Sequence, residues 1–160
     1  MTLLAPNRDL IGYKPLLIGD AWSDPRGGAV HRHVYAGNGE ATVDVGLAGA
    51  ADVDAAVAAA RDAFPAWRAL APAKRRDILL RCAELLRRDG ALIGQLETID
   101  NASPVRSARG SAGIAADWLA YNAGWAERIH GQTLHGGSPN SLDYVEAEPF
   151  GVIGVIIPWN

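Results

Sequence analysis

The segment "GVIGVII", residues 151–157, constrains the fold of this chain more than any other stretch. Apolar, largely β-branched residues occupy successive positions, so both faces of an extended strand would be apolar there. Such a strand is typical of the interior of a parallel sheet, which is covered on both sides. Parallel strands need neighbours and crossover connections, and only three residues follow the segment. We therefore predict a central parallel strand whose neighbouring strands are not supplied by the residues that follow it.

Composition favours one ordinary globular unit of 160 residues. Apolar residues make up 49% and charged residues 21%, with a net charge of -3. These values argue against disorder and against a nucleic-acid partner. Apolar runs are far shorter than the roughly 20 residues that a membrane-spanning helix needs, and the N-terminus does not resemble a secretory signal. We expect a cytoplasmic protein without a membrane partner.

Short strands are predicted at both ends of the chain. Residues 16–22, the turn-rich "SDPRGG" and residues 29–35 together predict a hairpin. A third short strand is expected near 41–47, where apolar residues alternate. Residues 132–148 predict a second hairpin. Because one face of this ribbon is not cleanly apolar, the pattern favours pairing with something outside the chain.

Three amphipathic helices are predicted in the first part of the middle region. The first begins at Asp52 and ends at Pro65, which cannot supply the next backbone donor. The second begins at Pro72, well placed in a first turn, and stops at Asp89–Gly90. The third uses apolar positions from Leu92 and ends near residue 101.

A fourth and longest helix is predicted after Pro104, with Gly131 as its stop. Its large apolar side chains recur at helical spacing, and such stripes usually pack inward. We therefore expect this stripe to belong to the core: Ile114, Trp118, Tyr121, Trp125 and Ile129.

Three other groups of residues could carry chemistry, and a structural role is preferred for each. His31 and His33 share a strand face, but no carboxylate or cysteine stands at ligand spacing, so no metal site is predicted. Cys82, the single cysteine, sits at an apolar helical position without a nearby histidine, which favours an inert core thiol. The basic residues at 74–76 and 87–88 are typical of a solvated helix face.

The ending "IIPWN" carries the strongest chemical signal. Pro158, Trp159 and Asn160 would bring a rigid turn, a flat apolar ring and an amide to the carboxyl edge of a parallel sheet, where such sheets bind ligands. A preorganised amide that donates to a developing oxyanion contributes roughly 3 to 4 kcal/mol. A structural role, in which the asparagine caps the next turn, has about equal support from the residues alone.

The segment "EPFGVIGVIIPWN" resembles the motif that ends the N-terminal third of the NAD(P)-dependent aldehyde dehydrogenase superfamily. Four other stretches resemble family segments in the same order: "LLIGDAW", "ADVDAAVAAARDAFPAWRALAPAKRRDIL", "LETIDNASP" and "DWLAYNAGWAERIHGQTL". The resemblance implies an α/β fold in three parts. Residues 1–131 would be the N-terminal segment of the dinucleotide-binding domain, 132–148 an oligomerisation hairpin, and 149–160 the first strand of a Rossmann-like sheet.

The resemblance also implies roles for the last five residues. Asn160 would help to form the oxyanion hole for a thiohemiacetal on a catalytic cysteine, and Ile156, Ile157, Pro158 and Trp159 would line NAD or NADP. The implied enzyme oxidises a small-molecule aldehyde to a carboxylic acid and assembles as a homo-oligomer, a dimer or tetramer. The family's nucleophile and general base follow the Pro-Trp-Asn motif. We therefore expect an N-terminal portion that does not turn over substrate by itself.

Two other interpretations stay open. The chain could be a non-catalytic remnant or an interaction module that pairs with a full-length relative through residues 132–148. It could also belong to a CoA-acylating or semialdehyde dehydrogenase, which shares the fold but differs downstream.

In each case we expect marginal stability of the bare chain, because a strand at 150–157 would expose unpaired edges and apolar faces.

Overall fold

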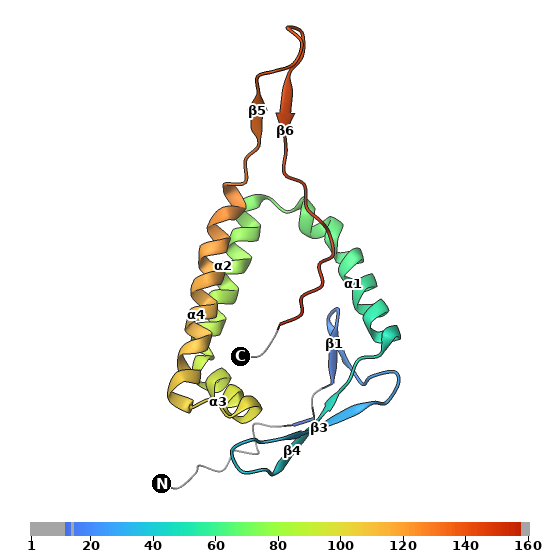
Figure 1. Cartoon of the computed structure of the whole chain (residues 1–160), viewed down its shortest axis with the longest axis vertical. Helices are drawn as coiled ribbons and strands as arrows, with labels where there is room; N and C mark the ends of the chain where they lie inside the picture. The colour runs from blue at the N-terminus through green and yellow to red at the C-terminus, as the bar shows by residue number, and fades with distance from the viewer. Residues whose placement is uncertain (1–11, 14, 158–160) are drawn as a thin grey trace.

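The computed structural model describes residues 12, 13 and 15–157 (Figure 1). Within them, helices and three two-stranded antiparallel sheets form an α/β arrangement. No helix among these residues is long and apolar enough to cross a membrane. The strands are β1 (Leu16–Ile18), β2 (Ala21–Ser23), β3 (Val30–Val34), β4 (Ala41–Gly46), β5 (Gln132–Leu134) and β6 (Asp143–Val145). The helices are α1 (Ala50–Ala69), α2 (Pro72–Arg88), α3 (Gly90–Asn101), α4 (Val105–Ala123) and the 3₁₀-helix η2 (Gly124–Glu127).

The N-terminal strands form two hairpins, so the single hairpin predicted over 16–35 is wrong. β1 pairs with β2 across the turn Gly19–Asp20, in which Gly19 has a φ of 64°. Glycine adopts this left-handed conformation without steric cost, and a two-residue turn led by glycine closes a tight hairpin. The prediction read both halves of this hairpin as one strand. β3 pairs with β4 instead, where Arg32 faces Asp44 at 3.1 Å between Nε and Oδ1.

Helix α1 extends beyond both of its predicted bounds. Asp52 lies in the first turn, not at the start, and is only 2% exposed. Its carboxylate accepts hydrogen bonds from the backbone N–H groups of Gly49, at 2.9 Å, and Arg26, at 3.2 Å. Asp52 therefore ties the turn after β2 to the beginning of the helix. Pro65 lies inside the helix rather than at its end, because it removes a single backbone donor and the helix continues for one more turn.

Replacing Asp52 with alanine is expected to lower the free energy of unfolding by about 1–3 kcal/mol, since two backbone donors would lose a buried acceptor. Asp52→Asn is the matched variant and should lose less, because its amide oxygen still accepts a hydrogen bond. Urea denaturation followed by circular dichroism measures both values. Unchanged stability of Asp52→Ala would contradict the role assigned to this carboxylate.

Helices α2, α3 and α4 form the packed part of the structure (Figure 1). The fully buried residues of α4 are all alanines, each at most 3% exposed: Ala108, Ala112, Ala116 and Ala123. Without large side chains at the contact, helix backbones approach closely. Where α3 crosses α4, a Cβ on Gly94 would lie 2.9 Å from backbone atoms of Ala108. The core of the described residues is therefore thin and consists mainly of alanine.

The prediction that the large side chains of the fourth helix form the core is wrong for the described structure. Trp118 is 63% exposed and Tyr121 is 61% exposed, because the alanine face of α4 takes the contact with α2 and α3. The helix also ends sooner than predicted, and Gly124 begins the short η2. Cys82 on α2 is exposed as well, and Ala83 beside it is buried, so the predicted core thiol is likewise wrong.

Ion pairs connect α2 to the elements packed against it. Arg87 Nη2 lies 2.6 Å from Asp117 Oδ1 on α4, and Arg76 pairs with Glu127 of η2. At the end of α2, the Arg88 guanidinium hydrogen-bonds Asp89 and lowers the pKa of that carboxyl. Exposed pairs of this kind contribute about 0.2–1 kcal/mol each. Arg87 and Arg88 are exposed, as predicted for a solvated helix face, whereas Arg76 is half-buried where it pairs with Glu127.

The β5–β6 ribbon projects from the helices as the most extended feature of the fold (Figure 1). Gln132 pairs with Val145 and Leu134 pairs with Asp143, and every residue of both strands is exposed. The hairpin predicted within 132–148 is confirmed, with shorter strands. Its two faces and outer edges are left for contact with other surfaces.

Residues 151–157 do not form the predicted strand. A strand is defined by hydrogen bonds to a neighbour, and none of the described strands pairs with this segment. Its side chains are correspondingly exposed, Val155 to 75% and Ile153 to 67%. The apolar pattern therefore lies on an unpaired segment of the described structure.

Candidate functional site

Two of the five predicted site residues lie in the described part of the chain. Ile156 is 97% exposed and Ile157 is 80% exposed, so both offer apolar surface to a ligand. Pro158, Trp159 and Asn160 lie outside the described residues. The structure therefore describes Ile156 and Ile157 and does not test the roles assigned to residues 158–160.

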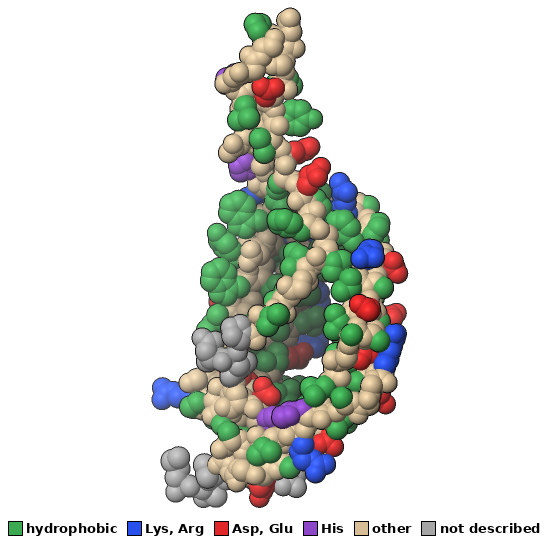
Figure 2. Space-filling view, turned by 45° about the vertical axis from the view of Figure 1, so that its right-hand side comes forward, with side chains coloured by type: hydrophobic (Ala, Val, Ile, Leu, Met, Phe, Trp, Pro, Cys, Tyr) green, Lys and Arg blue, Asp and Glu red, His purple; other side chains and the backbone are tan. Residues whose placement is uncertain are grey.

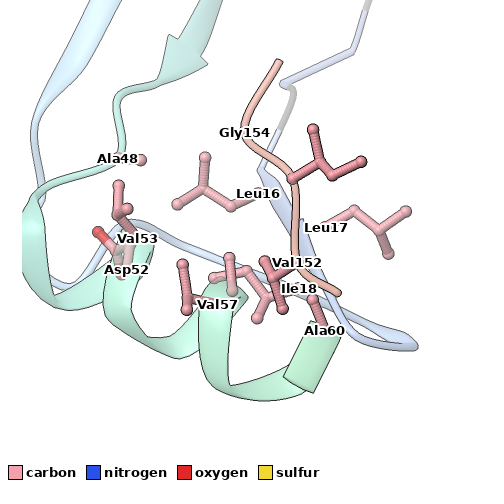
Figure 3. A pocket seen from close by; sticks show the side chains of 12 residues that line it. Leu16, Leu17, Ile18, Ala48, Asp52, Val53, Val57, Ala60, Val152 and Gly154 are labelled. Carbon is pink, nitrogen blue, oxygen red and sulfur yellow. The ribbon is translucent and has the colours of Figure 1, made fainter. Parts of the chain in front are cut away.

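An apolar hollow borders the C-terminal segment shortly before these isoleucines (Figure 3). Its volume is about 340 Å³, within the range of small-molecule sites. Three separate elements form it: β1, the first part of α1 and the C-terminal segment. The lining side chains include Leu16 and Ile18 from β1, Val53, Val57 and Ala60 from α1, and Val152 and Ile153 from the C-terminal segment.

The hollow can bind apolar groups, but its described lining has no free side chain that could act as a catalytic acid, base or nucleophile. Asp52 is the charged residue at its edge, and backbone donors already occupy that carboxylate. No histidine or cysteine lines it, and Cys82 lies on α2, which does not contribute to the lining. General acid–base or nucleophilic catalysis needs such a group within reach of the substrate. The hollow is therefore a packing site beside the predicted catalytic segment.

The sequence did not predict this hollow, although it predicted the helix that forms one of its walls. The apolar positions Val53, Val57 and Ala60 predicted a helix face that needs a partner. Nothing in the spacing indicated that β1 and residues 152–154 would lie opposite that face. Contacts between segments so far apart in sequence leave no local signal.

His33, one of the two histidines considered as metal ligands, makes its contacts within the chain. The Nε2 atom of His33 lies 2.8 Å from the backbone carbonyl oxygen of Asp100, and its Nδ1 atom contacts the Thr42 hydroxyl. His33 thus joins the β3–β4 hairpin to the end of α3. Among the described residues, no group of three or more histidine, cysteine, aspartate or glutamate side chains is placed to hold a metal ion.

Known proteins match this chain in both sequence and fold. A profile of the aldehyde dehydrogenase family matches residues 22–160. The aldehyde dehydrogenase of Aspergillus niger is 46% identical over 110 residues, 68% of this chain and 22% of that protein. Mitochondrial aldehyde dehydrogenase of Sus scrofa is 37% identical over 161 residues, 98% of this chain and 31% of that protein. The chain belongs to the aldehyde dehydrogenase family.

A solved structure extends this relationship to the fold. PnpE in complex with nicotinamide adenine dinucleotide matches with a TM-score of 0.78 and 34% identity, over 83% of this chain and 27% of PnpE. The predicted α/β fold, the N-terminal part of an aldehyde dehydrogenase-like structure, is confirmed. The chain spans less than a third of the length of these relatives.

Proposed function

We propose that this chain forms the N-terminal portion of an NAD(P)-dependent aldehyde dehydrogenase that oxidises an aldehyde to a carboxylic acid. The observation that carries the proposal is the family match over residues 22–160, which extends through the "IIPWN" ending. The relatives of Aspergillus niger and Sus scrofa are aldehyde dehydrogenases, which supports the same class of reaction here. We also propose a cytoplasmic location.

Asn160 is proposed to stabilise the oxyanion of the reaction. When a cysteine sulfur attacks the aldehyde carbon, the carbonyl electron pair moves to oxygen, and the Asn160 side-chain N–H would donate a hydrogen bond to it. A donor fixed before the reaction stabilises the developing charge without reorganisation. Cys82, on the exposed surface of α2, is not assigned the role of nucleophile.

Ile156, Ile157, Pro158 and Trp159 are proposed to line the nucleotide. The exposure of the two isoleucines supports this role, because apolar side chains held in the open can cover the flat face of a ligand. NAD or NADP, when bound, supplies the hydride acceptor for the oxidation. The contribution of these four residues is to orient that group by apolar and backbone contact.

A hybrid enzyme tests the proposed function. Residues 1–160 of this chain would replace the matching portion of the Sus scrofa mitochondrial enzyme, to which they are 37% identical. The hybrid should form NADH from an aldehyde, whereas the 160-residue polypeptide alone should form none. A soluble, cooperatively folded hybrid that binds NAD but yields no NADH would contradict the proposal.

Within the same hybrid, Ile156→Asp is expected to raise the KM for NAD about tenfold or more. A carboxylate placed against the apolar face of the nucleotide must lose its water, and tenfold corresponds to about 1.4 kcal/mol. Leu47→Asp is the matched control, since Leu47 is 48% exposed after β4, outside the proposed sites, and its replacement should leave the KM unchanged. Equal KM values in both variants would remove Ile156 from the nucleotide site.

The three-part organisation forms a further part of the proposal. Residues 1–131 would belong to the dinucleotide-binding domain and 132–148 to an oligomerisation ribbon. Residues 149–160 would become the first strand of the Rossmann-like sheet when neighbouring strands of a complete enzyme pair with residues 151–157, which are unpaired here. The exposed β5 and β6 strands favour an oligomer contact, because both edges of the ribbon can accept another strand. The same observation supports the second candidate, an interaction module that pairs with a full-length relative. Co-purification with such a relative, lost on deletion of 132–148, would favour that candidate.

A further inference from the structure

The turn between β3 and β4 contains the one Asn-Gly pair of this chain, Asn38–Gly39. This hairpin lies at the end of the molecule opposite the β5–β6 ribbon (Figure 1). Backbone and uncharged polar groups reach the surface at that end (Figure 2), and both residues of the pair are exposed. An asparagine side chain carries an electrophilic carbonyl carbon, and the next backbone nitrogen is a nucleophile in the same chain. The pair therefore holds both reactants of an intramolecular reaction.

Gly39 leaves the approach to the Asn38 side chain open. Its φ is 75°, and no described atom lies within 4 Å of the position that a Cβ would occupy. Glycine also changes its backbone dihedrals at low cost, and reactants held in one chain gain a high effective concentration. Four other asparagines precede a residue whose side chain crowds the attacking nitrogen: Asn7, Asn101, Asn122 and Asn140.

A hydrogen bond activates the side-chain carbonyl of Asn38. The backbone N–H of Glu40 donates to Asn38 Oδ1 at 3.0 Å, a bond that asparagine commonly makes two residues along the chain. When the Gly39 nitrogen attacks Cγ, the carbonyl electron pair moves to Oδ1. A donor already placed at this oxygen stabilises the charge that develops there. The turn therefore favours attack at Cγ.

A second hydrogen bond restrains the nucleophile. The Gly39 N–H donates to the carbonyl oxygen of Tyr35 at 2.8 Å. An amide nitrogen attacks only after it loses its proton, and a proton held in this bond is shielded from hydroxide. Exposed turns open locally at a small cost in free energy. Opening of the bond between Gly39 and Tyr35 would therefore precede the reaction.

We propose that Asn38 is a site of spontaneous deamidation, with the Gly39 nitrogen as nucleophile and water as co-reactant. The bond from this nitrogen to Cγ forms and the Cγ–Nδ2 bond breaks, so that ammonia leaves with the proton that Gly39 loses. Water then opens the cyclic imide at either of its two carbonyl carbons. Opening at Cγ leaves aspartate at position 38. Opening at the main-chain carbonyl leaves isoaspartate, in which the main chain runs through Cβ and Cγ.

The modification would change the β3–β4 hairpin. Both products add a negative charge to the turn, and isoaspartate adds one carbon to the main chain within it. The bond from Gly39 to Tyr35 spans this point. His33 lies two residues before Tyr35, and its Nε2 atom contacts the Asp100 carbonyl oxygen on α3 at 2.8 Å. The proposal therefore gives this link between the hairpin and α3 a chemical weak point. It does not depend on the dehydrogenase activity proposed above.

Peptide mapping of the 160-residue polypeptide tests the site. Trypsin releases residues 33–61, in which Asn38 is the single amide side chain, so a mass gain from exchange of NH2 for OH is assigned without ambiguity. We expect two products of this mass, formed faster as pH rises because more of the nitrogen is deprotonated. Asn140, an exposed residue followed by Ser141, is the internal control and should react about tenfold or more slowly. An equal or faster reaction at Asn140 would overturn the proposal.

A variant and a denaturant test the two roles assigned to Gly39. Gly39→Ser should slow the reaction at Asn38 about tenfold or more, because the added side chain crowds the nitrogen. Gly28→Ser is the matched control, since Gly28 is another left-handed glycine in open space, with a φ of 63°, and follows no asparagine. Concentrated urea should speed the reaction of the unchanged chain, because it opens the bond to Tyr35. An unchanged rate in Gly39→Ser would overturn the proposal, and an equal or slower rate in urea would remove the restraint assigned to Tyr35.

Discussion

In the hybrid enzyme that carries residues 1–160, replacing Asn160 with alanine is expected to lower kcat by about 10²- to 10³-fold, the usual cost of removing one oxyanion donor. The hydrogen bond forms only as negative charge develops on the aldehyde oxygen, so its loss raises the barrier without weakening substrate binding equally. Steady-state rates of NADH formation measure the effect, with KM for the aldehyde expected to change little.

Asn140→Ala provides the matched control for Asn160→Ala. Asn140 is an exposed asparagine in the loop of the ribbon, so its replacement should leave kcat unchanged. Asn160→Asp extends the test, because a carboxylate cannot donate the hydrogen bond when ionised and repels the oxyanion. If Asn160→Ala keeps the kcat of the unchanged hybrid, Asn160 has the capping role that the residues alone left open.

Replacing Gly94 with alanine should give the largest loss of stability of any single methyl addition to the helical part. A Cβ at this position would lie 2.9 Å from the carbonyl carbon and oxygen of Ala108 and from the Cα of Arg109. Backbone atoms cannot turn aside as a flexible side chain can, so α3 and α4 must separate. Overpacking of this kind costs about 1–3 kcal/mol of unfolding free energy, measured by urea denaturation.

Gly113→Ala is the control that separates this clash from the ordinary effect of removing a helical glycine. Gly113 also lies within a helix, α4, but nothing stands within 4 Å of the Cβ that alanine would add. Alanine there should raise the unfolding free energy by about 0.5–1 kcal/mol, because glycine is a poor helix former. The two substitutions should therefore have opposite signs. A gain of stability from both would show that α3 and α4 do not approach as closely as described.

The helix positions could be predicted because their signals are local. Pro72 suits a first helical turn and Asp89 follows the last residue of α2, as the structure confirms. Pro65 shows the limit of such a signal, since α1 passes through it. The loss of one hydrogen bond near a helix end is small enough for the remaining turn to persist.

The orientation of α4 could not be predicted because it depends on a competition between two faces. One face carries alanines and the other carries Ile114, Trp118 and Tyr121, and helical periodicity fits both faces. Burial of a large apolar side chain is worth more free energy than burial of an alanine, so the sequence favoured the face with the large side chains as the core. The described neighbours are α3, with Gly94 at the crossing, and α2, with Ala83 buried at 0% exposure. Their small residues match the alanine face, and that information lies outside α4.

The candidate site was predicted by resemblance and only partly by physical reasoning. The β-branched run at 151–157 indicated a strand, but pairing depends on partners that the segment itself does not encode. The chemistry of an amide after Pro158 and Trp159 indicated an oxyanion donor among other roles. The oxyanion role of Asn160 therefore stays a proposal, which rests on the resemblance of its motif to the family.

A crystal structure of the hybrid with NAD and an aldehyde adduct bound tests the central claim most directly, namely that residues 156–160 form the nucleotide wall and the oxyanion donor. The account predicts Ile156, Ile157, Pro158 and Trp159 in van der Waals contact with the nucleotide. It also predicts the Asn160 Nδ2 atom at about 2.9 Å from the oxygen of the adduct, a normal hydrogen-bond distance. A nucleotide seated away from residues 156–159, with the Asn160 amide hydrogen-bonded to backbone instead of the adduct, would contradict it.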